Sequence, residues 1–80
     1  MWHLKTRLGT FWVIEKTLSS TQHQYYLGVD DNELASYTDA NQAAQDVYNQ
    51  ATGYFQWDCQ SRIKVPTDLA DWVEGDPENW

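Results

Sequence analysis

Few side chains in this 80-residue sequence could do covalent chemistry: there is one cysteine, and there are two histidines. A thiol nucleophile needs an adjacent base and a third group that orients the base. The best such set is Cys59 with His23 and Asp58. Both histidines, His3 and His23, fall in segments with the pattern of β-strands. We therefore predict that the chain is not an enzyme and that its thiol has ordinary reactivity.

Metal and phosphate sites lack their usual ligands. Structural zinc takes four closely spaced Cys or His side chains, and the chain contains three in total. The run Asp30-Asp31-Asn32-Glu33 resembles a calcium loop, but it lacks the alternating ligands and central glycine of an EF-hand, so we interpret it as a turn. The four glycines are isolated, which argues against a phosphate-binding loop. We expect no metal and no cofactor.

Charge is the strongest feature of the sequence. Twelve Asp and Glu oppose five Lys and Arg, which gives a formal net charge of −7 and a pI near 4.3. Five cations are too few to neutralise the phosphates of a nucleic acid, and we therefore predict no direct nucleic-acid binding. The excess of acids instead predicts a partner protein with a Lys/Arg-rich surface. Residues 1–20 hold three bases against one acid, net +2, and residues 21–80 hold two bases against eleven acids, net −9.

The densest acids lie near the C-terminus, beside two tryptophans. Residues 68–78 contain five acids and no base. Trp and Tyr anchor protein interfaces, and carboxylates steer the approach of a basic partner. The alternative interpretation is that the same residues bind no partner and form only a solvated surface that keeps the protein in solution. The predicted partner-binding residues are Asp68, Asp71, Trp72, Glu74, Asp76, Glu78 and Trp80, with Asp30, Asp31 and Glu33 as an extension of the patch.

A single small domain must position these residues. Hydrophobic residues make up 41% of the chain and aromatics 15%, which excludes a disordered acidic tail. Alternating or β-prone residues predict strands over 2–8, 11–17 and 23–29, and a short fourth strand over 33–37. Turns are expected at Gly9-Thr10 and at Asp30-Asp31-Asn32.

The clearest predicted element is an amphipathic helix. Its apolar residues recur at helical spacing: Ala40, Ala43, Ala44, Val47, Tyr48 and Ala51. Thr38 or Asp39 can cap the first turn, and Gly53 can follow the end.

The remaining segments predict shorter elements. Residues 54–57 and 63–65 have the composition of short strands. Thr67 or Asp68 can cap a short helix in which Leu69, Trp72 and Val73 share a face. Residues 1–80 are thus expected to form one α+β domain: an antiparallel sheet of three to five strands, one helix packed on a face, and a short C-terminal helix.

Ten Trp and Tyr exceed what so small a core can bury, so some must reach the surface. The expected core aromatics are Trp12, Tyr26, Trp57 and Trp72. The expected surface aromatics are Trp80, Tyr25, Tyr37 and Tyr54. Exposed rings of this kind also suit stacking on sugars, which is the rival use.

The sequence predicts a cytosolic protein. The first residues alternate polar and apolar side chains, whereas a secretory signal needs an uninterrupted apolar stretch. The longest apolar run, Phe11-Trp12-Val13-Ile14, is far shorter than a membrane span. One cysteine cannot form an internal disulfide.

In its general character, as a small acidic α+β domain rich in Trp and Tyr, the chain resembles the inhibitor proteins of phages and mobile elements, including anti-CRISPR proteins and DNA mimics. The resemblance rests on length, charge and the acidic run from Asp68 to Glu78. It implies a non-enzymatic protein that occupies the nucleic-acid-binding surface of a partner protein and inhibits it. The alternatives are a carbohydrate or small-ligand module, and a structural or adaptor domain.

Overall fold

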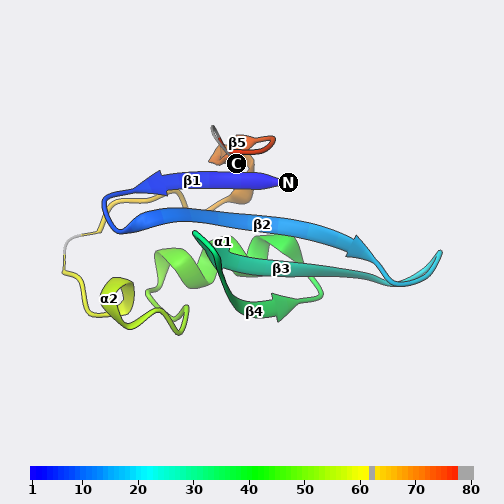
Figure 1. The fold of residues 1–80 in the computed structure, drawn as a ribbon, viewed down its shortest axis with the longest axis horizontal. Helices are drawn as coiled ribbons and strands as arrows, with labels where there is room; N and C mark the ends of the chain where they lie inside the picture. Colours follow the sequence, from blue (N-terminus) through cyan, green and yellow to red (C-terminus); the bar gives the residue numbers. More distant parts are fainter. Residues whose placement is uncertain (62, 78–80) are drawn as a thin grey trace.

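The computed structural model describes residues 1–61 and 63–77 as one five-stranded antiparallel sheet with helical segments. The strands are β1 (Trp2–Thr6), β2 (Gly9–Thr17), β3 (His23–Val29), β4 (Asn32–Tyr37) and β5 (Val73–Glu74), in the order β4-β3-β2-β1-β5 (Figure 1). The helix α1 (Ala40–Tyr48) packs on one face, and α2 (Phe55–Asp58) and the 3-10 helix η1 (Leu69–Asp71) are short. The predicted α+β fold is confirmed.

Two turns of the meander are held by side chains that the local sequence supplies. The Thr6 hydroxyl donates to the carbonyl of Gly9 at 2.6 Å and accepts from the N–H of Leu8 at 3.2 Å. Asp30 has a φ of 50°, a left-handed conformation that Asp tolerates. Its carboxylate accepts from the N–H of Thr10 at 3.0 Å, which ties the β3–β4 turn to β2.

The main core lies between the sheet and α1. Alternate side chains of β2 and β3 point toward the helix, as the two-residue period of a strand requires. Small alanines on α1 let its backbone approach the sheet closely. The buried members of this core are Phe11, Val13, Leu27, Val29, Ala43, Ala44, Val47, Trp57, Leu69 and Trp72.

Trp12 is buried on the opposite face of the sheet, because it alternates with Phe11 and Val13. It pairs across the strands with Gly28, and its Nε1 donates to the carbonyl of Asp30 at 2.8 Å. A Cβ on Gly28 would lie 1.9 Å from a ring carbon of Trp12. The indole therefore fills the space that a side chain at residue 28 would occupy.

The other expected core and surface aromatics are mostly half-buried. Tyr26, expected in the core, is half-buried, and the ammonium of Lys16 lies 4.8 Å from its ring centre. Tyr25, Tyr37 and Tyr54, expected at the surface, are also half-buried. The prediction for Trp80 lies outside the described residues.

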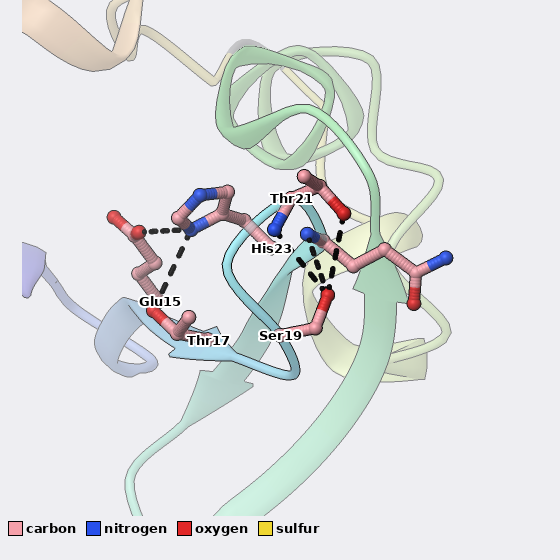
Figure 2. A network of polar contacts seen from close by, with 6 residues as sticks. Glu15, Thr17, Ser19, Thr21 and His23 are labelled. Atoms are coloured by element: carbon pink, nitrogen blue, oxygen red, sulfur yellow. Dashed lines mark hydrogen bonds and ion pairs between the residues drawn. The ribbon is translucent and has the colours of Figure 1, made fainter.

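β2 and β3 project beyond their neighbours as a hairpin, and the molecule is 41 Å long (Figure 1). β1 pairs with β2 only as far as Val13. Figure 2 shows the polar network that closes the hairpin: the Ser19 hydroxyl accepts from the N–H groups of Thr21 and Gln22 at 3.3 and 3.1 Å. Hydrogen bonds from the Ser19 side chain to its neighbours thus form the turn that follows β2.

Residues 55–58 form the helix α2, although a strand was predicted over residues 54–57. The Asp58 carboxylate accepts from the N–H and hydroxyl of Thr52, at 3.0 and 2.8 Å, and from the N–H of Gly53 at 2.9 Å. These bonds bring Asp58 back to residues 52 and 53 and so favour a helical turn. The side chain of Trp57 then lies in the core, where its Nε1 donates to the carbonyl of Val47 at 2.9 Å. An alternating aromatic run is compatible with either structure, and these contacts select the helix.

Two further boundaries differ from the sequence prediction. α1 ends at Tyr48, and the left-handed residue after it is Gln50, with φ 58°, although Gly53 was predicted to follow the helix end. The side-chain amide of Gln50 donates to the carbonyls of Trp57 and Gln60, and these hydrogen bonds offset the cost of the left-handed backbone conformation. Residues 63–65 form no strand, since the described part of this segment pairs with no neighbour.

The N-caps agree with the sequence, and the C-terminal helix is shorter than expected. Asp39 caps α1 and Asp68 caps η1, each accepting from the N–H two residues later at 2.9 Å. After η1 the chain becomes extended, so Val73 joins β5 opposite His3 and is exposed instead of sharing a face with Leu69. The turn that was predicted at Gly9-Thr10 lies instead at residues 7 and 8.

Across the described ranges, no helix has the length and apolar character that crossing a membrane requires.

Tyr37 joins β4 to α1, because its hydroxyl donates to Oδ2 of Asp46 at 2.6 Å. Burial, and then the hydrogen bond and negative charge of Asp46, raise the pKa of Tyr37 above its usual range. The unfolded chain, with a tyrosine pKa near ~10, therefore loses this proton first as pH rises. The stability linked to Tyr37 is complete below about pH 10 and declines above it.

We expect Tyr37→Phe to reduce the loss of stability between neutral and strongly alkaline pH. The measurement is urea unfolding across that range, with Tyr48→Phe as the control because Tyr48 is exposed at the end of α1. Identical alkaline slopes for wild type and Tyr37→Phe would contradict the prediction.

Candidate functional site

The structure divides the predicted partner-binding residues into two separate groups. The first, on η1, β5 and the residues flanking them, lies beside Trp2 and His3 at the start of β1. The second, at the β3–β4 turn, lies beside Thr10 near the start of β2. Thr10 pairs with Lys5, three residues along β1 from Trp2, so the groups are about 10 Å apart along the strand direction. The strands β1 and β2 also lie between them in the sheet. The first group contains Asp68, Asp71, Glu74 and Asp76, the second contains Asp30, Asp31 and Glu33, and Glu78 and Trp80 lie outside the described residues.

The four carboxylates of the first group are exposed. None of them makes an ion pair with another residue of the described ranges. Their negative charge therefore faces solvent, and no cation of the described part of the chain pairs with it. In the second group, by contrast, Asp30 is a structural residue that holds the turn to Thr10.

Asp68 shares a groove with Asp39, which the sequence suggested mainly as a helix cap. The groove has a volume of about 510 Å³ and lies between β1, β3, the start of α1 and η1. Trp2 and Tyr25 contribute aromatic rings to its wall. We call it the acidic groove, lined by Trp2, Tyr25, Asp39, Asn41, Asp68 and their neighbours.

The two carboxylates of the acidic groove are held in place by their capping bonds. Oδ1 of Asp39 accepts from the N–H of Asn41, and Oδ1 of Asp68 accepts from the N–H of Ala70. The side chain of Asn41 then accepts from the N–H of Leu69 at 3.0 Å, which joins α1 to η1. Oδ2 of each aspartate has no hydrogen-bond partner among the described residues.

This arrangement suits a cationic side chain. Two fixed carboxylates with unused oxygens can accept charge-assisted hydrogen bonds from a guanidinium or ammonium group. Aromatic rings beside them can cover the apolar part of a Lys or Arg side chain and attract its charge. The acidic groove can therefore receive one basic side chain.

Trp72, a predicted anchor, lies in the core and does not present its ring to a partner in this structure. It is 5% exposed, and its buried Nε1 has no hydrogen-bond partner within the described structure. Trp2 and Tyr25 instead supply the aromatic surface next to the acids. The alternation over residues 2–8 placed Trp2 in a strand, but no local signal linked it to Asp39 and Asp68.

The residues considered for nucleophilic chemistry are not assembled. Cys59 is exposed after α2, whereas His23 begins β3 at the projecting hairpin, at the other end of the molecule (Figure 1). Nδ1 of His23 lies 2.8 Å from Oε1 of Glu15 (Figure 2). Asp58 is engaged with Thr52 and the following residue. Within residues 1–61 and 63–77, no three His, Cys, Asp or Glu side chains group so as to hold a metal ion.

No family model, curated protein or solved structure matches this chain. The acidic groove is therefore interpreted from the chemistry of its own residues. That chemistry is a pair of fixed carboxylates beside two aromatic rings.

Proposed function

We propose that the chain is a non-enzymatic binding protein whose acidic groove takes a Lys or Arg side chain from a partner protein. The observation that supports this function is the shared groove of Asp39 and Asp68 with Trp2 and Tyr25. The exposed acids that continue the surface, among them Asp71, raise the rate of encounter with a basic partner.

The proposed partner uses that basic surface to handle nucleic acid. By occupying it, this chain inhibits the partner, as the resemblance to phage and mobile-element inhibitors implies. The interaction takes place in the cytosol. A net charge of −7 supports this role, since an acidic surface competes with phosphates for the same cations.

The groove can be tested without disturbing the fold, because Asn caps helices about as well as Asp. We expect Asp39→Asn with Asp68→Asn to weaken binding of a short arginine-rich peptide by about tenfold or more, through loss of charge-assisted hydrogen bonds. Isothermal titration calorimetry measures the affinity. The matched control, Asp31→Asn with Glu33→Gln, removes the same charge at the β3–β4 turn. Equal weakening by both double variants would show a general charge effect and reject the groove.

The surrounding acids have a kinetic signature. We expect Asp71→Asn, Glu74→Gln and Glu78→Gln together to slow association with the partner and to flatten its salt dependence, because steering depends on exposed charge. A pull-down at low and high salt identifies the partner, and surface plasmon resonance measures the rates. Unchanged association rates in a folded triple variant would contradict the proposal.

Carbohydrate binding, the rival function, depends on exposed aromatic rings. Three of the four described tryptophans, Trp12, Trp57 and Trp72, are buried. We therefore favour a protein partner. Saturable quenching of tryptophan fluorescence by a sugar would reverse that preference.

A further inference from the structure

A second groove lies at the opposite end of β1, and its lining is basic although the chain is acidic. It has a volume of about 400 Å³ and lies between the β1–β2 turn, α2 and the segment that follows α2. Among the nine described residues that line it, three are cations, Lys5, Arg7 and Lys64, and none is an acid. The whole chain has five cations against twelve acids. We call this site the basic groove.

The other residues that line the basic groove are largely apolar. Leu8, Ile63, Val65 and Trp57 line it. Trp57 is 4% exposed, its indole donates to a buried carbonyl, and its ring packs edge-on against Phe11 at 4.9 Å between centroids. The indole of Trp57 is therefore fixed in place. The half-buried side chains of Leu8, Ile63 and Val65 supply the apolar surface that can contact the uncharged part of a ligand.

The wall that carries Arg7 is also held in place. The Thr6 hydroxyl closes the turn in which Arg7 lies, and the Tyr54 hydroxyl donates to the carbonyl of Leu8 at 3.0 Å. On the other side, the Gln50 amide donates to the carbonyl of Gln60. The β1–β2 turn is thus tied to the body of the protein, and the segment after α2 is tied at Gln60.

Arg7 and Lys64 are exposed, and neither has an ion-pair partner among the residues that the structure describes. Lys5 already has a contact of its own, so we place the ligand's charge on the other two. Two cations in one groove repel each other, and an anion bound between them offsets that repulsion. A group with two negative charges therefore matches the two positive charges of Arg7 and Lys64.

We propose that the basic groove binds a small phosphate monoester with an apolar body. Arg7 takes two phosphate oxygens with its planar fork, and Lys64 supplies a second charge. The apolar body rests on the half-buried side chains of Leu8, Ile63 and Val65. A polymer such as single-stranded nucleic acid is disfavoured, because its further phosphates would meet a chain of net charge −7. This site is independent of the acidic groove.

The test is an NMR titration of the whole chain with phenyl phosphate. We expect shifts at the amides of Arg7, Leu8 and Lys64 and at the indole of Trp57. Inorganic phosphate lacks the apolar body and phenol lacks the charge, so each is expected to bind about tenfold more weakly or less. Absence of shifts at these groups at millimolar phenyl phosphate overturns the proposal.

Substitutions of Arg7 and Lys64 test whether these two cations bind the phosphate group. Arg7→Gln and Lys64→Gln are each expected to weaken phenyl phosphate binding by about tenfold, and Arg7→Lys by less, since it keeps the charge and loses the fork. Lys16→Gln is the matched control, because Lys16 lies at the other end of β2. Equal weakening by Lys16→Gln, or tighter binding of a short single-stranded oligonucleotide than of phenyl phosphate, overturns the proposal.

Discussion

Gly28→Ala is expected to lower the free energy of unfolding by about 2–3 kcal/mol, because the new methyl group would overlap the indole of Trp12. A Cβ at this position would lie 1.9 and 2.3 Å from two carbons of that ring. The ring cannot move aside freely, since its Nε1 donates to the carbonyl of Asp30. Urea unfolding followed by circular dichroism measures the change.

The same substitution is expected to change sign when the ring is removed. In a Trp12→Val background, Gly28→Ala meets open space and gains about 0.5–1 kcal/mol, because glycine in a strand interior loses more backbone entropy on folding than alanine. The double-mutant cycle thus isolates one contact on the sheet face away from α1. Equal destabilisation by Gly28→Ala in both backgrounds would mean that the two residues are not coupled.

Trp57→Ala is expected to cost about 3–5 kcal/mol, as truncation of a buried tryptophan usually does. Its ring packs on Phe11, and its indole satisfies the carbonyl of Val47 inside the protein. Trp57→Phe keeps most of the packing but loses the indole hydrogen bond to that carbonyl, which still accepts from the N–H of Gln50 at 3.2 Å. A smaller cost of about 0.5–1.5 kcal/mol is therefore expected. Thermal and urea unfolding measure both.

Phe55 is the matched control for Trp57, because it belongs to the same short helix and is 77% exposed. Phe55→Ala is expected to change stability by no more than about 0.5 kcal/mol. Comparable losses for Phe55→Ala and Trp57→Ala would show that α2 does not dock through Trp57. The basic groove would then lose its rigid floor, since the same indole lines it.

The elements that were predicted correctly are those whose signals are local. The alanine spacing over residues 40–51 and the Asp39 cap lie within one helix and its first turn, so neighbouring residues suffice to specify α1. Asp30 similarly tolerates the left-handed conformation that its turn requires. By contrast, α2 depends on Trp57 reaching the carbonyl of Val47, a contact between residues ten positions apart.

The candidate site was less predictable than the fold. Asp68, Asp71, Glu74 and Asp76 remain one exposed group because they are close in sequence. Asp39 and Asp68 share a groove only because α1 packs against η1, through the hydrogen bond from the N–H of Leu69 to Asn41. No pattern within either segment indicates that contact.

The sequence by itself determined an α+β domain and an acidic protein, because strand alternation, helical spacing and net charge depend on composition and near neighbours. Only the tertiary structure decided where the charge lies. Packing buries Trp72 and separates the β3–β4 turn from the acids of η1 and β5. It also gathers Arg7 and Lys64 into a groove with no acid among its described lining residues. Electrostatic attraction and repulsion fall off steeply with distance in salt, so the local arrangement of charges, and not their sum, determines which ligand each groove can hold.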